Sequence, residues 1–324
     1  MYKIVVDAMG GDNGSKVIIE AINNFLKNHQ DVEVIVVGNE VELAPLKNTC
    51  RIVHAPGVVP MTAGALEVMH MKDASMNVAL KLYKEENCNA VISCGSTGGF
   101  LSAATIILKL VPGLKRAALV NPFPTQIKGK YVTILDMGAN NENSPEELLQ
   151  FAKMGRLYVQ SVYNIKEPKV YLLSNGSEDH KGCPEVKAAN KLLRETNFPN
   201  FCGNIEARYV LTGEADVIVC DGYSGNILLK GIEGTAKWMA GFIKTMFKKN
   251  LWSKIGYLHV RKDMKNFQET MDYKSVGGAM LLGVNGIVVK AHGNSDAYAF
   301  ESAMKVAYKM AKADIVKNMQ EGMK

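Results

Sequence analysis

Polar side chains at a strand end mark residues 213–234 (GEADVIVCDGYSGNILLKGIEG) as the stretch best suited to chemistry. Residues 217–220 form a run typical of a strand buried on both faces, and Asp221 follows it directly. Ser224 and Asn226 come next, where a helical pattern begins. A strand that turns into a helix presents free backbone N–H groups and a partial positive charge, which bind ligands. We therefore predict that these three polar residues contact a substrate.

The same turn has a simpler interpretation, in which Asp221 and Ser224 only cap the helix. Asn226 fits that interpretation less well, because a cap lies at or before the first helical turn. Asparagine is also a poor residue inside a helix, so its presence there needs another reason.

Five further turns rich in Gly, Ser and Asn also follow predicted strands, at residues 7–12, 93–99, 136–141, 175–176 and 292–295. In a parallel sheet such turns meet at one edge, where their N–H groups bind phosphate or another oxyanion. The candidate substrate- or phosphate-binding residues in the turns are Asp7, Gly10, Gly11, Asp12, Ser96, Thr97, Gly98, Asn140, Asp221, Ser224 and His292. No turn has a Walker A or dinucleotide-binding pattern, so no nucleotide cofactor is expected.

Lys181, in the loop EDHKG, is a candidate cation for phosphate or for a developing oxyanion. A solvated loop lysine is the alternative. His180 and His292 are candidate proton carriers, although a lone histidine is more often structural. Cys94 and Cys183 also lie in candidate loops, but no histidine is spaced to act as their base, which argues against covalent catalysis.

The composition is that of an ordinary soluble protein, with 324 residues, 47% hydrophobic and 22% charged. No apolar run is long enough to cross a membrane, and the first residues predict a strand and a turn instead of a signal peptide. The six cysteines form no CxxC pair and no ligand spacing. We therefore expect reduced cytoplasmic thiols and no bound metal.

The net charge of +6 is unevenly distributed, since residues 234–262 hold seven Lys or Arg and no acidic residue. Apolar residues recur there at helical spacing together with both tryptophans, which is typical of a helix lying on an anionic membrane. The candidate membrane-binding residues are Trp238, Phe242, Met246, Phe247, Lys248, Lys249, Leu251 and Trp252. A core or dimer-interface helix is the alternative. No nucleic-acid-binding motif is present, so nucleic acid is not an expected partner.

Strand-like and helix-like runs alternate along the whole chain. Strands are predicted at residues 2–7, 33–38, 51–56, 90–95, 117–120, 131–136, 169–174, 217–220 and 286–290. The main helices are predicted at 15–27, 64–85, 144–162, 184–195 and 295–317, with others starting near residues 96 and 226. This order predicts a three-layer α/β/α fold with a largely parallel sheet. We expect one domain over residues 1–324, or two lobes around a cleft, with residues 234–262 as a helical arm.

Several motifs closely resemble those of the bacterial phosphate acyltransferase (PlsX) family and cover nearly the whole chain. They are DAMGGD (7–12), SCGSTG (93–98), LDMGAN (135–140), PEELLQFAKMG (145–155), HKG (180–182), GNIEAR (203–208), residues 213–234, and GGAMLLGVNGIVVKAHGNS (277–295). The resemblance implies a fold similar to phosphotransacetylases and isocitrate/isopropylmalate dehydrogenases. It also implies transfer of a fatty acyl group from acyl carrier protein to inorganic phosphate for phospholipid synthesis, with no metal or cofactor.

The resemblance further implies that the catalytic residues are Lys181 and Asn226. We assign Lys181 to phosphate or oxyanion stabilisation and Asn226 to the thioester carbonyl oxygen. The resemblance also implies a cytoplasmic homodimer that associates reversibly with the membrane as a peripheral protein. The basic stretch at 234–262 is also suited to dock the acidic acyl carrier protein.

The sequence departs from the family pattern at Ser15, Ser96, Ala117 and Met280. These changes bear on loop shape and acyl chain length more than on the reaction. Two rival functions remain open at this point: an NAD- and metal-dependent dehydrogenase on the same fold, and a non-catalytic membrane-bound scaffold.

Overall fold

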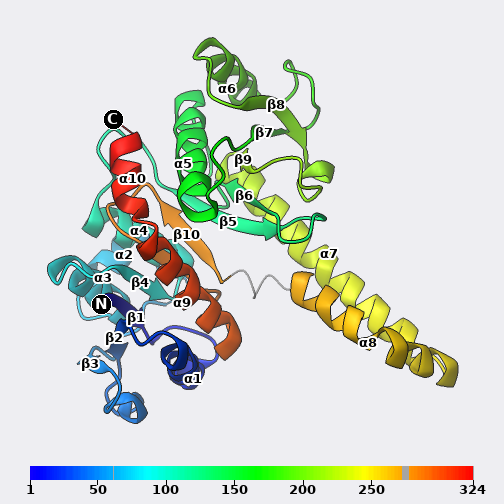
Figure 1. Cartoon of the computed structure of the whole chain (residues 1–324). Coiled ribbons are helices and arrows are strands. Elements are labelled where there is room, and N and C mark those ends of the chain that lie inside the picture. The colour runs from blue at the N-terminus through cyan, green and yellow to red at the C-terminus, as the bar shows by residue number, and fades with distance from the viewer. Residues whose placement is uncertain (61, 272–276, 324) are drawn as a thin grey trace.

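The computed structural model describes residues 1–60, 62–271 and 277–323, which form one 11-stranded sheet flanked by helices (Figure 1). The sheet order is β3-β2-β1-β4-β11-β10-β5-β6-β9-β7-β8. The strands are β1 (Tyr2–Asp7), β2 (Val32–Gly38), β3 (Arg51–His54), β4 (Ala90–Ser93), β5 (Ala118–Pro124), β6 (Tyr131–Leu135), β7 (Val170–Ser174), β8 (Phe201–Glu206), β9 (Val217–Val219), β10 (Ala279–Leu282) and β11 (Val288–Lys290). The α-helices are α1 (Gly14–Asn28), α2 (Ala65–His70), α3 (Ser75–Glu85), α4 (Thr97–Leu108), α5 (Pro145–Tyr163), α6 (Pro184–Glu195), α7 (Gly222–Lys248), α8 (Leu251–Met271), α9 (Ala297–Lys312) and α10 (Ile315–Gly322). Two short 3-10 helices, η1 (Ala44–Leu46) and η2 (Ala207–Tyr209), complete the described elements.

Strand direction reverses in the middle of the sheet. β3, β2, β1, β4 and β11 are parallel to one another, and so are β6, β9, β7 and β8. Between these sets, β10 is antiparallel to both of its neighbours and β5 is antiparallel to β6. The two sets therefore run in opposite directions.

This reversal refines the expected architecture. The predicted α/β fold with a largely parallel sheet is confirmed. The expectation that all of the glycine-rich turns meet at one edge is wrong, because β10 and β5 reverse the direction of the chain. The turns after β1, β4 and β11 therefore follow strands of one direction, and the turns after β6, β9 and β7 follow strands of the other. Turns from both sets nevertheless line one cavity.

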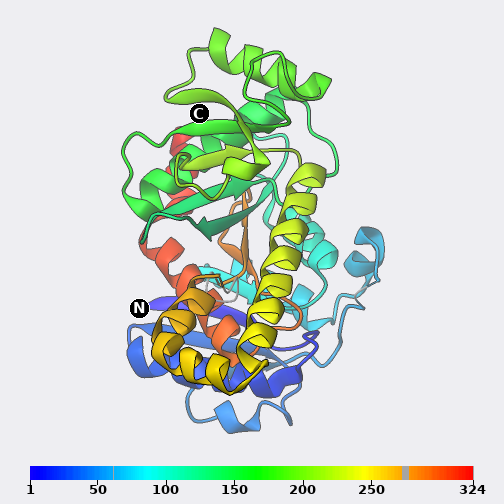
Figure 2. The ribbon, with the colours of Figure 1, turned by 90° about the vertical axis from the view of Figure 1, so that its right-hand side faces the viewer.

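Helices cover both faces of the sheet and make the three layers (Figures 1 and 2). On one face α1, α5, α6, α9 and α10 bury a core that contains Phe151, and on the other α2, α3 and α4 bury a core that contains Phe100. In β1, Ile4 packs in the first core and Val5 in the second, and neither side chain is exposed. Burial on both faces explains why these strands are nearly continuous apolar runs.

The helix ends follow local sequence signals. At the start of α5, Ser144 accepts a hydrogen bond from the Glu147 backbone N–H at 3.3 Å, and the Glu147 carboxylate accepts one from the Ser144 N–H at 3.1 Å. This capping box confirms the predicted helix start. The helix predicted over 64–85 is instead two helices, α2 and α3. The Asn77 side chain of α3 donates to the carbonyls of Val68 (2.7 Å) and Met71 (2.9 Å) at the end of α2.

Three other elements differ from the sequence-based prediction. The final helix, predicted over 295–317, is divided into α9 and α10 at Asp314, whose φ of 47° is left-handed. β8 and β10 were not predicted as strands. β10 follows Gly277 and Gly278, which both have positive φ, and its residues are buried between β11 and β5.

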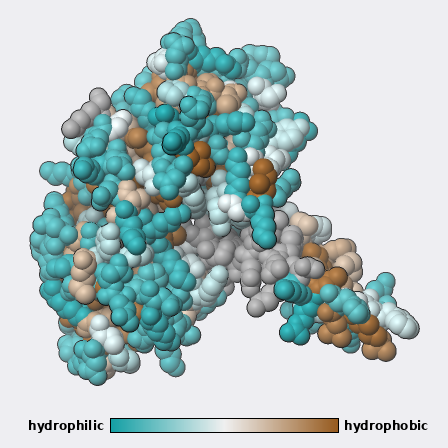
Figure 3. All heavy atoms as spheres, in the orientation of Figure 1, coloured by the Kyte–Doolittle hydropathy of each residue, from teal (hydrophilic) through white to brown (hydrophobic). Residues whose placement is uncertain are grey.

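α7 and α8 form an arm that extends away from the sheet (Figures 1 and 2). The exposed fractions of Trp238, Phe242 and Met246 on α7 are 69%, 62% and 49%, and those of Leu251 and Trp252 at the start of α8 are 71% and 80%. Figure 3 shows hydrophobic residues gathered at the outer end of the arm, beside hydrophilic ones. None of the helices in the described part of the chain is both long and apolar enough to cross a bilayer.

Candidate active site

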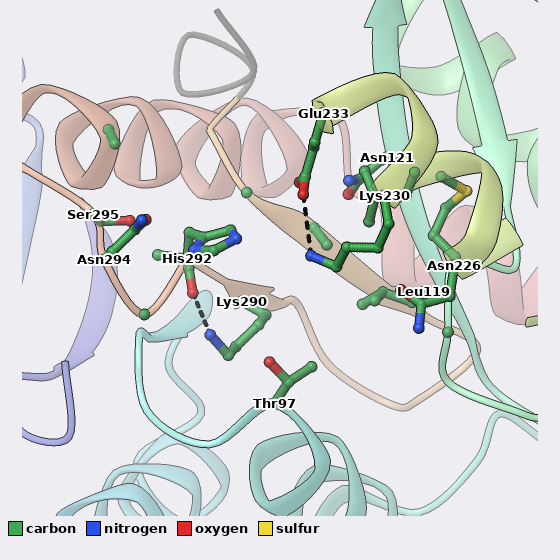
Figure 4. A pocket seen from close by; sticks show the side chains of 18 of the residues that line it. Thr97, Leu119, Asn121, Asn226, Lys230, Glu233, Lys290, His292, Asn294 and Ser295 are labelled. Carbon is green, nitrogen blue, oxygen red and sulfur yellow. Dashed lines mark hydrogen bonds and ion pairs between the residues drawn. The ribbon is translucent and has the colours of Figure 1, made fainter. Parts of the chain in front are cut away.

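A cavity of about 420 Å³ lies where the two sets of strands meet (Figure 4). It is lined by the central strands β5 and β10, by the end of β11 and the turn after it, by the loop after β6, and by α4 and α7. Its apolar lining includes Leu119, Phe123, Met137 and Leu229, and its polar lining includes Asn121, Asn226, Lys290 and His292. An apolar cavity with a few polar groups is typical of a small-ligand site.

The first turn of α4 forms part of the wall of this cavity. Ser96 caps the helix, its hydroxyl accepting a hydrogen bond from the Gly99 N–H at 3.3 Å. Thr97 and Gly98 line the cavity, and their N–H groups precede the first intrahelical hydrogen bond. The helix therefore presents its partial positive charge to an anion in the cavity.

The start of α7 is held tightly against the loop after β6. Asp221 caps α7 by accepting a hydrogen bond from the Ser224 N–H at 2.8 Å. A Cβ on Gly222 would lie 1.9 Å from the Asn140 carbonyl oxygen, so no larger residue fits there. Asn226, one turn on, is exposed to the cavity, and its side-chain amide makes no hydrogen bond to a described residue (Figure 4).

The turns after β1, β4 and β11 contact one another, and those after β4 and β11 also line the cavity. The Ser93 hydroxyl donates to the buried Asp7 carboxylate at 2.6 Å, and the Asp12 N–H donates to the Gly293 carbonyl at 2.8 Å. A Cβ on Gly11 would lie 2.6 Å from the Cys94 sulfur, so only glycine allows this contact. Burial raises the pKa of Asp7, and hydrogen bonds from serine hydroxyls oppose that rise.

Asp136, at the end of β6, organises the loop that faces Asn226. Its carboxylate accepts hydrogen bonds from the N–H groups of Leu119 (2.9 Å), Ala139 (2.9 Å) and Asn140 (2.9 Å). The Asn140 side-chain amide donates to Asp136 at 2.7 Å and to the Ala117 carbonyl at 2.8 Å. Asn140 thus braces the loop, and its predicted contact with substrate stays a prediction.

Two lysines line the cavity in different ways. Lys230 of α7 forms an ion pair with Glu233 at 3.0 Å, and its side chain is 60% exposed (Figure 4). Lys290 is buried at the end of β11, and its ammonium donates to the Ala291 carbonyl. Burial lowers the pKa of Lys290 to about 8, although Cys94, Asp7 and Asp12 oppose that fall. Burial also lowers the pKa of His292, which favours the neutral form of its imidazole.

The structure brings together only part of the predicted site. Thr97, Gly98, Asn226 and His292 line the cavity. The other predicted substrate-binding residues shape the loops around the cavity without lining it: Asp7, Gly10, Gly11, Asp12, Ser96, Asn140, Asp221 and Ser224.

Lys181 lies in the loop between β7 and α6 and is not among the residues that line the cavity. Asn204 holds this loop from β8, donating to the Glu178 carbonyl at 2.8 Å and to the Lys181 carbonyl at 3.5 Å. The catalytic role of Lys181 therefore stays a prediction. The described residues contain no group of three or more His, Cys, Asp or Glu side chains that could hold a metal ion.

The sequence relatives decide the family. The family model described as "Fatty acid synthesis protein" matches residues 2–318. A phosphate acyltransferase of Clostridium perfringens (strain SM101 / Type A) is 40% identical over 327 residues, which cover 98% of this chain and 96% of the relative. The chain belongs to the phosphate acyltransferase family. A second phosphate acyltransferase, from Staphylococcus aureus (strain MRSA252), is 37% identical with 99% of this chain and 98% of the relative covered.

Family membership confirms the resemblance predicted from the motifs and makes the chain an acyltransferase, and it supports phosphate as the acceptor.

Solved structures show how widely the fold is shared. A phosphotransacetylase from Streptococcus pyogenes superposes with a TM-score of 0.61 at 18% identity, over 98% of this chain and 94% of that one. A branched-chain phosphotransacylase from Enterococcus faecalis V583 gives 0.62 at 16% identity, over 96% and 99%. At these identities the likeness concerns the fold alone.

Sequence reasoning missed Lys290 as a site residue. It lies inside the motif GIVVKAHGNS, at the end of a predicted strand and directly before a predicted substrate turn. A lysine at the end of a run of buried β-branched residues is the signal that could have identified it, because charged residues are rarely buried without a partner.

Proposed function

We propose that this chain transfers a fatty acyl group from acyl carrier protein to inorganic phosphate, giving acyl phosphate for phospholipid synthesis. The observation that carries the proposal is the composition of the cavity. Apolar side chains offer space for an acyl group, the first turn of α4 offers N–H groups to an anion, and Asn226 offers an uncommitted amide.

In the proposed reaction a phosphate oxygen forms a bond to the thioester carbonyl carbon. The tetrahedral intermediate then expels the thiolate of the carrier protein as the carbon–sulfur bond breaks. Asn226 donates a hydrogen bond to the carbonyl oxygen, where negative charge develops. A thioester is already activated and phosphate is already a nucleophile, so the proposed chemistry uses positioning and charge stabilisation and needs no cofactor.

Lys181 is proposed as a second stabiliser of phosphate or of the oxyanion. Lys181 is not among the residues that line the cavity, so this role is proposed for a carrier-bound substrate that extends beyond the cavity to the loop of Lys181. Asn204 and Asn190 are buried beside that loop and hydrogen-bonded to each other at 2.9 Å, which supports an ordered loop.

We propose that the arm contacts both a membrane and the acyl donor. Its exposed aromatic residues support contact with an anionic membrane, and its lysines support docking of an acidic carrier protein. We further propose a cytoplasmic homodimer that associates peripherally with the membrane. The proposal of a dimer rests on the family resemblance alone.

The proposed function is tested by incubating the purified chain with acyl carrier protein loaded with a long-chain acyl group and with phosphate. We expect acyl phosphate and free carrier protein to appear in equal amounts, only when phosphate is present. Acyl-CoA in place of acyl carrier protein serves as the donor control. Donor consumption that does not depend on phosphate would reject the proposal, and no consumption at all would favour a scaffold.

A further inference from the structure

Lys290 is a buried cation on the cavity wall, and the proposed reaction assigns it no role. It is the last residue of β11 and is only 6% exposed. β11 pairs with β4 so that Lys290 lies beside Ser93, three residues before the cap of α4. Lys290 and the first turn of α4 therefore reach the cavity from adjacent strand ends (Figure 4).

The charge of Lys290 has no direct partner of opposite sign. Its ammonium donates to the neutral Ala291 carbonyl. No carboxylate oxygen of a described residue lies within 4.0 Å of the ammonium nitrogen, the limit for an ion pair. The Cys94 thiol and the carboxyl groups of Asp7 and Asp12 are the acidic groups that act on its pKa. Asp7 is hydrogen-bonded to Ser93 instead, and burial holds its pKa above the ordinary value.

A buried ammonium without a carboxylate is costly, since both ion pairing and full hydration are lost. The backbone that carries Lys290 is also held in place, because a Cβ on Gly278 would lie 2.5 Å from the Lys290 carbonyl oxygen. Lys230 offers a contrast within the same cavity, since Glu233 already neutralises it. Lys290 is therefore the cavity cation that stands to gain most from an incoming anion.

We propose that Lys290 binds the phosphate acceptor, with its ammonium contacting a phosphate oxygen while the Thr97 and Gly98 N–H groups hold the others. This inference rests on the proposed function and adds to it the subsite for the acceptor. A lysine acts on phosphate as a point charge, and a helix amino terminus supplies directed N–H donors, so the two features complement each other. Asn226 then stands on α7 to meet the carbonyl of the acyl donor.

The test measures the KM for phosphate and for the acyl donor in Lys290→Met and Lys290→Gln. Glutamine keeps a donor for the Ala291 carbonyl but removes the charge, so it separates a structural role from phosphate binding. We expect both variants to raise the KM for phosphate about 10- to 100-fold and to leave the KM of the donor nearly unchanged. Lys128→Met removes one charge from an exposed loop and should leave both constants at wild-type values.

A wild-type KM for phosphate in folded Lys290→Gln would overturn the assignment, and so would equal changes in both KM values. If neither variant folds, a crystal structure of the wild-type protein with inorganic phosphate decides: a phosphate oxygen within about 3 Å of the Lys290 ammonium supports it, and phosphate bound elsewhere overturns it. Phosphate binding without acyl donor, followed by calorimetry, separates the two proposals. Lys290-dependent binding without acyl phosphate formation would reject the proposed function and keep the subsite.

Discussion

Gly138 faces Asn226 at the cavity, and a Cβ on Gly138 would lie 3.5 Å from both Cβ and Cγ of Asn226. The φ of Gly138 is 122°, a backbone conformation that residues other than glycine rarely adopt. Five hydrogen bonds to the Asp136 carboxylate hold the loop that contains Gly138. The loop therefore fixes the position of Asn226, which we propose donates a hydrogen bond to the substrate carbonyl.

Substitution of Gly138 tests this contact. In Gly138→Val the added methyl groups press against Asn226, and a displacement of about 1 Å is enough to lower kcat by about 100-fold. The control is Gly129→Val, which carries similar backbone strain at φ 79° but has no atom within 4 Å of an added Cβ. We expect both variants to lower the thermal midpoint and only Gly138→Val to lower kcat. Equal kcat values in the two variants would contradict the contact.

Lys181 provides a separate test of the predicted catalytic pair. Lys181→Ala should fold normally, because the side chain lies in a partly exposed loop, and should lose about 100- to 1,000-fold in kcat. Lys187→Ala, an exposed lysine on α6, is the matched control and should keep wild-type turnover. Near wild-type turnover in Lys181→Ala would remove this lysine from the reaction and leave Lys290 as the candidate cation.

Buried Lys290 also predicts a pH dependence of stability. Its pKa is about 8 in the folded chain, whereas the ordinary value is 10.5. Between these pH values the unfolded chain holds a proton that the folded chain has released, so the free energy of unfolding rises with pH. The rise attributable to this group is on the order of 3 kcal/mol. The free energy of unfolding, measured by urea denaturation, should rise more from pH 8 to pH 10.5 for the wild type than for Lys290→Met. An equal rise in both proteins would contradict burial of the ammonium.

The arm predicts a fluorescence response, because the only tryptophans of the chain, Trp238 and Trp252, are exposed on it. Anionic vesicles at low salt should shift the emission to shorter wavelength, and added salt should weaken the effect. Neutral vesicles are the lipid control, and a Lys248→Glu, Lys249→Glu variant is the protein control. An unchanged spectrum with anionic vesicles at low salt would count against membrane contact.

Local signals in the sequence predicted most of the individual elements. α5 begins where Ser144, Pro145 and Glu147 place it, because a capping box needs only neighbouring residues. β1 was also predicted from local sequence alone, because its run of β-branched residues is typical of a buried strand. The break between α2 and α3 was not predicted, because the Asn77 hydrogen bonds to Val68 and Met71 at the end of α2 join residues of separate turns, which apolar spacing does not reveal.

The sheet direction and the site depended on contacts between distant residues. β10 is a short run between glycines, and its antiparallel pairing with β5 and β11 reverses half of the sheet. Nothing local to residues 279–282 specifies those partners. For the same reason Asn226 and His292 could be predicted as polar residues at strand ends, whereas their place in one cavity could not. Lys290 was missed because its burial follows from β4 and β10 on either side.

The central claim is that phosphate attacks an acyl carbonyl held by Asn226 in this cavity. The most direct measurement is the rate of acyl phosphate formation from acyl carrier protein and labelled phosphate, compared between the wild type and Asn226→Ala. Tyr223→Ala, an exposed change in the same part of α7, is the control and should match the wild type. We predict labelled acyl phosphate from the wild type, with a rate about 100- to 1,000-fold lower for folded Asn226→Ala. A rate near that of the wild type in Asn226→Ala would contradict the account.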